Sequence, residues 1–448
     1  MSCHCPGGHG SRRDFLRVGA LSGLGISLSQ YLELKAMTAP TSAKVQACIL
    51  LWLDGGPSQV DTWDPKPKSA FKPISTNVAG IQISELFPKI ARQMDKLAII
   101  RSLHTEENNH GEATHYAATA HRPNPGMKFP SFGSIITKET GHRNNVPPYV
   151  QVMEMPKGKV YDEFFKAQFI GAQYDPMVIP NPNPLAGKGQ IQNDVKAFDV
   201  PDLSLPESLS VDQLDDRRSL LKLVDQTYRR KVERTEFSSM DTFTGEAWKM
   251  ILAPEVRKAF DLSQEPEKTR EAYGRTGFGQ SVLLARRLVE SGSRFVTAGG
   301  YKGQAWDTHY DNDKLLRDTL GPSFDQTVSA LITDLDQRGL LESTLIIAMG
   351  EFGRTADINL DRGRDHWCYC WSVLLGGGGI RCGQVVGASD EHGAYVADGG
   401  VSMGDVFATV YKAFGIDWTK EYMHPIGRPI KIANSIDDLT GTPIRELI

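Results

Sequence analysis

The sequence predicts an α/β fold, namely a doubly wound, mostly parallel central sheet flanked by helices, with a helical insertion. Three observations carry this prediction. Short apolar runs recur along the 448 residues, amphipathic helical patterns lie between them, and polar residues follow several of the apolar runs directly. Continuous apolar runs are typical of parallel strands covered on both faces. Their alternation with helical patterns is typical of doubly wound sheets.

Five apolar runs are predicted to be strands of this sheet. The first, VQACILLWL at residues 45–53, is almost unbroken and stops at Asp54, which a Gly-Gly-Pro turn follows. The other four are LAIIRS at 97–102, RFVTA at 294–298, TLIIAM at 344–349 and WSVLL at 371–375. Open α/β sheets bind ligands beyond the carboxyl ends of their strands. We therefore expect Asp54 at a ligand-binding edge.

Helices are expected between these strands. The apolar residues of 324–335 fall at i, i+4, i+7, i+8 and i+11, which is one stripe of an amphipathic helix, and Gly339 is expected to end it. Residues 207–290 are charged and contain many leucines, and they are interpreted as a helical insertion whose last helix covers 280–290. The segment 174–208 is rich in proline, asparagine and glycine, which predicts a long loop.

The first 43 residues have the pattern of an export leader, and residues 44–448 are expected to form the α/β domain. Two arginines, Arg12 and Arg13, precede an uncharged, glycine-rich stretch at 18–30, as in twin-arginine signals. This stretch is shorter than the roughly 20 apolar residues of a membrane span, although an uncleaved leader would be a weak anchor. We expect the twin-arginine machinery to export the folded protein to the periplasm or the exterior.

The charge and the cysteines limit the partners and the redox roles that we expect for this protein. The formal net charge is −4, the pI is near 6.3, and the basic residues are scattered, so no nucleic-acid partner is expected. In an oxidising compartment Cys382 could pair with Cys368 or Cys370. A redox role for Cys368 and Cys370 is an alternative, but no neighbouring cation is predicted to lower their pKa. Cys48 is expected in the core.

Residue types that bind metals follow several predicted strands. Asp54 ends the first, HTEENNHGEATHYAATAH (104–121) follows the second, WDTH (306–309) follows the third, and Glu351 follows the fourth. Five of the eleven histidines lie within 104–142, and histidine clusters outside apolar stripes are not readily explained as core. Divalent cations take carboxylates and imidazoles from separate elements of a fold. The sequence therefore predicts a metal site at this edge of the sheet.

One segment carries a family resemblance. GLLESTLIIAMGEFG (339–353) resembles the GLLDNTLVVFTSDHG segment of sulfatases, which belong to the alkaline phosphatase-like superfamily. The resemblance places Glu351 and Asp54 at metal-binding aspartates of that superfamily. TAHRP at 119–123 resembles the end of the sulfatase nucleophile loop, and counting back places His110 at the nucleophile position. Since sulfatases have there the cysteine that becomes formylglycine, formylglycine chemistry is not implied.

The twin-arginine leader and the WDTH, GEFGRT and GRDHW segments together resemble a large bacterial, twin-arginine-exported, sulfatase-like family of unknown function, over most of residues 45–440. By this resemblance Asp307, His309 and His366 occupy the remaining metal-ligand positions. Phe352 stands where a two-metal phosphatase has another ligand. A full two-metal centre is therefore not implied.

The predicted centre holds one or two divalent cations (zinc, calcium, magnesium or manganese), which would neutralise an ester oxyanion and lower the pKa of bound water toward about 7. Its predicted metal ligands are Asp54, Asp307, His309, Glu351 and His366. Arg354 is interpreted as a clamp for phosphate or sulfate, or as an ordinary surface ion pair. His110 is a candidate ligand, general acid or nucleophile. Thr114 is a second candidate nucleophile, or a helix N-terminal residue.

Two functional hypotheses follow. The first is a metal-dependent hydrolase of sulfate or phosphate esters, acting on a small molecule or a polysaccharide. The second is a sulfatase-like periplasmic or surface protein that binds ligands without catalysis, which His110 and Phe352 favour because neither is the residue that the enzymes carry at its position.

Overall fold

The computed structural model describes residues 45–152, 163–180, 253–301 and 304–448, together with positions 213, 216 and 219. The chain divides into two compact units, Met1–Ala43 and Lys44–Ile448, and the described residues all belong to the second. The predicted export leader lies outside them, so export stays a prediction.

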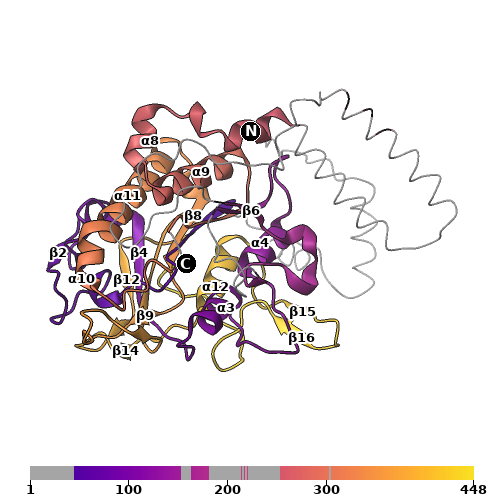
Figure 1. Cartoon of the computed structure of the whole chain (residues 1–448). Coiled ribbons are helices and arrows are strands. Elements are labelled where there is room, and N and C mark those ends of the chain that lie inside the picture. Colours follow the sequence, from indigo (N-terminus) through magenta and orange to yellow (C-terminus); the bar gives the residue numbers. More distant parts are fainter. Residues whose placement is uncertain are drawn as a thin grey trace, which may run out of the picture. The chain divides into compact units, whose positions relative to one another are not determined.

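An eight-stranded sheet runs through this unit (Figure 1), in the strand order β12-β4-β11-β8-β1-β7-β5-β6. Its strands are β1 (Ala47–Trp52), β4 (Leu97–Leu103), β5 (Tyr149–Val152), β6 (Met177–Ile179), β7 (Phe295–Ala298), β8 (Thr344–Met349), β11 (Trp371–Gly377) and β12 (Gln384–Val386). Neighbours are parallel except at β11, which is antiparallel to both β4 and β8. The predicted mostly parallel sheet is confirmed, and each of the five predicted strands is present within two residues of its expected bounds.

Helices cover both faces of the sheet, as Figure 1 shows. One face carries α7 (Pro254–Phe260), α8 (Glu267–Tyr273), α9 (Gly277–Ser291) and α11 (Gly321–Gln337), and the other carries α3 (His110–Thr119), α4 (Phe132–Thr140) and α12 (Met403–Ala413). Alternate residues of β1 belong to two different core clusters, with Ile49 and Leu51 on one face and Cys48 and Leu50 on the other. An unbroken apolar strand is therefore required at this place.

The helix α11 bears out the predicted apolar stripe. The five residues of that stripe are all buried, and Gly339 follows the helix with a φ of 68°. The helix α12 begins with a reciprocal capping box between Ser402 and Asp405, which satisfies two backbone donors of its first turn.

Three strands of the eight-stranded sheet, β5, β6 and β12, were not predicted. Of these, β6 lies inside the predicted loop 174–208 and pairs with β5 at the edge of the sheet, so that prediction is wrong for Met177–Ile179. Residues 181–208 lie outside the described residues, as does 207–252 of the predicted insertion except at three positions. The last helix of that insertion, predicted at 280–290, is α9, which packs against β1 and β7.

Small elements complete the described chain. They are α10 (Asn312–Leu315) and four two-stranded sheets, formed by β2 (Pro73–Ser75) with β3 (Gln82–Ser84), β9 (Gly353–Arg354) with β10 (His366–Trp367), β13 (Ala388–Ser389) with β14 (Val396–Asp398), and β15 (Glu421–Met423) with β16 (Pro429–Lys431). Among the described residues, no helix has the length and apolarity needed to cross a membrane. Cys48, Cys368, Cys370 and Cys382 form no disulfide, so the predicted pairing of Cys382 with Cys368 or Cys370 is not present.

Candidate metal centre

The candidate centre lies beyond the carboxyl ends of neighbouring parallel strands. Asp54 follows β1, the WDTH segment follows β7, and Glu351 follows β8, while His110 begins α3 in the connection after β4. The β9–β10 hairpin adds His366, which is paired with Arg354. Because β7, β1 and β8 are adjacent and parallel, their tips meet at one edge of the sheet, as predicted for a ligand site.

Three ligand atoms converge at the middle of this edge. Asp307 Oδ1 lies 3.2 Å from His309 Nε2 and 3.2 Å from His366 Nε2, and the two Nε2 atoms are 3.0 Å apart. A tetrahedral cation with bonds of about 2.05 Å holds its ligand atoms about 3.3 Å apart. The triangle thus has nearly the dimensions of one face of such a coordination shell.

The outer nitrogens of both imidazoles are held by acceptors. His309 Nδ1 lies 2.8 Å from Asp365 Oδ1, and His366 Nδ1 lies 3.0 Å from the carbonyl oxygen of Asn108. Hydrogen bonds from Asn359 and His309 hold the pKa of Asp365 below its usual range, so its carboxylate accepts. Each Nδ1 therefore carries a proton, and in the neutral rings both Nε2 lone pairs point at Asp307. Such backing of imidazoles by acceptors is typical of metal-ligating histidines.

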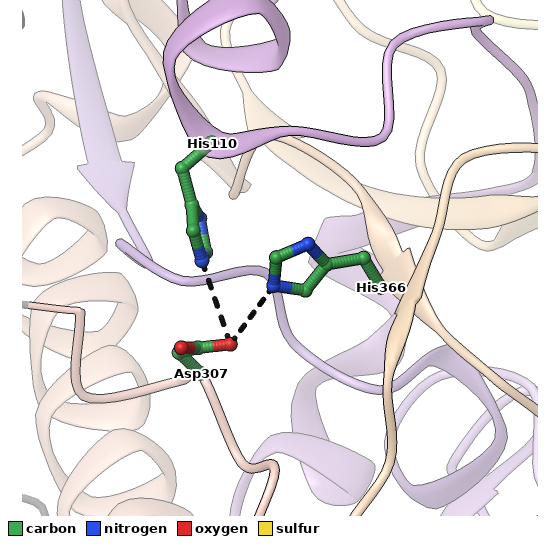
Figure 2. Close-up of side chains that lie close together, drawn as sticks. All are labelled: His110, Asp307 and His366. Atoms are coloured by element: carbon green, nitrogen blue, oxygen red, sulfur yellow. Dashed lines mark hydrogen bonds and ion pairs between the residues drawn. The ribbon is translucent and has the colours of Figure 1, made fainter.

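His110 joins this triangle to a buried carboxylate. Its Nδ1 lies 2.6 Å from Glu351 Oε1, and its Nε2 lies 3.5 Å from Asp307 Oδ1. In Figure 2, His110 and His366 both point at Asp307, and the three residues offer ligand atoms that lie within 4.8 Å of one another. Although burial opposes it, the two carboxylates raise the pKa of His110 to about 9. A hydrogen bond from His110, together with the charge of Arg354, outweighs burial and holds the pKa of Asp307 well below its usual range.

Two acidic side chains meet beside His110. Glu351 is fully buried, and the backbone N–H of Gly55 donates to both of its oxygens, at 3.0 and 3.1 Å. Burial and the charge of Glu351 raise the pKa of Asp54 to about 8. Two carboxylates that interact in this way repel each other unless one of them is protonated or a cation lies between them. Asp54 and Glu351 therefore form a second candidate position for a cation.

The glycine turn after β1 allows these segments to approach one another. Gly55 has a φ of 109°, and a Cβ at this residue would lie 2.3 Å from the backbone nitrogen of Asp307. The carbonyl of Asp54 accepts from the N–H of Trp306 at 3.0 Å. Glycine is required here because both the positive φ and the close approach exclude a side chain.

Arg354 is fully buried behind the triangle and is not part of a surface ion pair. Its Nε donates to the carbonyl of Gly56 at 3.0 Å and its Nη1 to the carbonyl of Arg364 at 3.1 Å, while its Nη2 contacts the carbonyl of Gly55 and Asp307 Oδ1. This network fixes Asp307 against the glycine turn. The predicted role of Arg354 as an anion clamp stays a prediction.

Thr114 and Phe352 lie close to His110. Thr114 is in the second turn of α3 and 1% exposed, and its hydroxyl has no hydrogen-bond partner among the described residues. Phe352 is fully buried, and its ring centroid lies 5.0 Å from that of His110 and 4.5 Å from that of His366. This phenylalanine supplies no ligand atom and packs against two imidazoles.

Sequence reasoning missed the residues that hold the ligands in place. Asp365 orients His309, and the buried pair of Asp61 and Arg364 anchors the segment that carries His366, with Nε–Oδ2 at 2.7 Å and Nη2–Oδ1 at 3.1 Å. The GRDHW segment could have indicated two of them, because Arg364 and Asp365 directly precede His366 in the sequence. The predicted redox alternative loses support, because burial raises the pKa of Cys368 to about 11 and that of Cys370 to about 12.

Solved structures with a similar arrangement share little sequence with this chain. The lipoteichoic acid synthase LtaP from Listeria monocytogenes is 8% identical and has a TM-score of 0.40, with 90% of this chain and 77% of that chain covered. A protein in the alkaline phosphatase superfamily from Vibrio parahaemolyticus is 9% identical, with a TM-score of 0.41 and coverages of 84% and 68%. The sulfatase PsFucS1 from Pseudoalteromonas sp. is 14% identical, with a TM-score of 0.37 and coverages of 86% and 70%. TM-scores this low assign no function.

A family model gives the assignment. No curated protein sequence matches the chain. The model described as "Protein of unknown function (DUF1501)" matches residues 45–448, which include every residue of the candidate centre. The chain therefore belongs to the DUF1501 family.

Proposed function

We propose that this protein is a metal-dependent hydrolase of sulfate or phosphate esters that does not use formylglycine. The observation that carries the proposal is the convergence of Asp307 Oδ1, His309 Nε2 and His366 Nε2, three atoms without a proton between them in the neutral rings. Arg354 and His110 already contact Asp307 Oδ1, but the two Nε2 lone pairs, 3.0 Å apart, repel each other unless a cation or a proton lies between them. Their place beyond the strand tips is where α/β folds bind substrates.

The donor set fits one or two divalent cations. Asp307, His309 and His366 would hold the first cation. Asp54 and Glu351 would hold a second, and His110 lies between the two positions. Two imidazole nitrogens favour zinc over calcium, magnesium and manganese, which take mainly oxygen ligands. A bound cation would neutralise the ester oxygens and activate water.

His110 is the residue we assign to proton transfer. Its Nδ1 is held by Glu351, which leaves Nε2 directed at the centre. In the charged form, Nε2 would give its proton to the leaving oxygen as the bond from that oxygen to sulfur or phosphorus breaks, while water forms the new bond. Phe352 packs against one side of the ring and fixes its plane.

We base the proposed site of action on the predicted leader. We propose that twin-arginine export delivers the protein to the periplasm or the exterior, where it acts on a small ester or a polysaccharide ester. The pair Arg12 and Arg13 and the uncharged stretch after it support this location.

Hydrolysis of a panel of aryl sulfates, aryl phosphates and phosphodiesters tests the proposal. We expect one class to be hydrolysed, with activity lost on chelation, restored by zinc or manganese, and reduced at least about 100-fold in Asp307→Asn. His392→Ala is a matched control, because His392 is half exposed and pairs with Glu391. Full activity in metal-free protein would contradict the proposal.

A binding protein without catalysis is the second candidate. Two observations favour it. Carboxylates contact both ring nitrogens of His110, and the other candidate nucleophile, Thr114, is buried. In that case the wild type would bind metal in stoichiometric amount but turn over no ester in the panel. An enzyme would instead lose turnover in His110→Ala, and this variant would still bind a cation at the triangle.

A further inference from the structure

A separate cavity of about 630 Å³ lies on the flank of α3. Gly111, Glu112 and His115 line it, and at 100° per residue they lie on the side of the helix turned away from His110. The loop 123–129 and the segment 163–168 form the other walls. Its volume is within the range of small-molecule sites, and the candidate centre makes no use of it.

Aromatic and apolar side chains form the body of this α3 cavity. Met127, Phe129 and Phe164 line it. The imidazole of His115 meets both rings edge-on, with centroids 5.8 Å from Phe129 and 5.2 Å from Phe164. These walls suit a ligand with a flat or compact apolar body.

The charges that line the cavity are predominantly negative. Glu107 and Glu112 line it and form no ion pair within the described part of the chain. Lys128 is the only lysine or arginine among the described lining residues, and it is paired with Glu163 at 2.5 Å. Both carboxylates therefore lack an ion-pair partner in the described part of the chain. Burial raises the pKa of Glu107, and the charge of Glu112 adds to this although the charge of Arg122 opposes it.

The buried polar atom left free in the cavity is an acceptor, Nε2 of His115. His115 is 7% exposed, and its Nδ1 lies 2.9 Å from the carbonyl of His121, which only accepts, so Nδ1 carries the proton. Its Nε2 has no hydrogen-bond partner among the described residues. The amide of Gln168 already donates to the carbonyl of Glu163 at 2.6 Å. A ligand that satisfies this cavity must bring donors and positive charge.

We propose that the α3 cavity binds a small organic cation, a primary amine attached to an apolar body. Glu107 and Glu112 pair with the ammonium group, His115 Nε2 accepts one of its protons, and Phe129 and Phe164 enclose the apolar part. The cavity excludes carboxylate, sulfate and phosphate groups. This assignment is independent of ester hydrolysis at the candidate centre and is tested without an activity assay.

Calorimetric titration of the full chain with three matched probes tests the proposal. Phenethylamine is expected to bind saturably in the millimolar range or below, 2-phenylethanol at least about tenfold more weakly, and phenylacetate not at all. The quaternary probe phenethyltrimethylammonium keeps the charge but has no proton for His115, and it is expected to bind more weakly than phenethylamine.

Substitutions locate the binding. Glu107→Gln and Glu112→Gln are each expected to weaken phenethylamine binding about tenfold, while binding of 2-phenylethanol is unchanged. Glu106→Gln is the control, because Glu106 is adjacent in sequence but does not line the cavity and pairs with Arg122. Thermal unfolding verifies that each variant is folded. The proposal is overturned if phenylacetate binds as well as the amine, if no amine binds, or if the two cavity variants bind it like wild type.

Discussion

Replacing Arg354 separates a positioning role from a role in binding substrate. The guanidinium is fully buried and serves the carbonyls of Gly55, Gly56 and Arg364 as well as Asp307. In Arg354→Lys, the ammonium group can keep the contact with Asp307. It cannot replace the Nε and Nη1 donors that bind the carbonyls of Gly56 and Arg364. Two buried carbonyls then lose their donors at about 1–3 kcal/mol each, so we expect the free energy of unfolding to fall by about 4 kcal/mol.

Urea unfolding of wild type, Arg354→Lys and Arg354→Met measures this cost. The methionine variant is expected to lose more, because it also leaves Asp307 without its cation. Arg362→Lys is the control, since Arg362 is 80% exposed and, among the described residues, forms an ion pair with Asp311 alone, and its loss should stay within about 0.5 kcal/mol. If Arg354→Lys unfolded within about 1 kcal/mol of wild type but lost affinity for sulfate or phosphate, Arg354 would be a ligand for substrate and the positioning argument would be refuted.

Three further predictions concern the histidines and the thiols. Asp365→Asn is expected to weaken cation binding about 10- to 100-fold in a chelator competition, whereas the exposed Asp361→Asn should not. Burial lowers the pKa of His121 to about 4. Between pH 4 and about 6.5 the unfolded chain therefore binds more protons than the folded chain. The free energy of unfolding should fall by up to about 3 kcal/mol as the pH drops through this window. Acid unfolding curves in which His121→Phe kept the whole of this pH dependence would contradict that assignment. Cys368 and Cys370 are buried, with pKa values raised to about 11 and 12, so a thiol reagent at pH 8 should modify them only on unfolding, and rapid reaction of either in the native protein would restore the redox alternative.

The strands that the sequence predicted are those in which burial on both faces leaves an unbroken apolar run. Residues 344–349 and 45–53 are of this kind. The three residues of β6 and of β12 are too short for any periodicity to be visible. The antiparallel direction of β11 was also not predictable, because WSVLL is equally apolar in either direction. Its direction is set by the 350–370 connection, which contains the β9–β10 hairpin.

For the candidate centre, residue types were predictable but their partners were not. Aspartate, glutamate and histidine at strand tips predicted a cation site. The division into a triangle around Asp307 and a Glu351–His110 pair depends on how residues 304–311 fold back over the glycine turn. Three of the four partners of the Arg354 side chain are backbone carbonyls. Every residue has a carbonyl, so the sequence does not show which ones an arginine will bind. An arginine at a strand tip therefore suggested a surface or substrate contact although it is buried.

The most direct measurement is an anomalous difference map from crystals of the protein grown with manganese or zinc. We predict a peak bonded at about 2.0–2.2 Å to Asp307 Oδ1, His309 Nε2 and His366 Nε2. A map without a peak between these three atoms, or with metal bound only elsewhere on the protein, would contradict the claim that they share a cation.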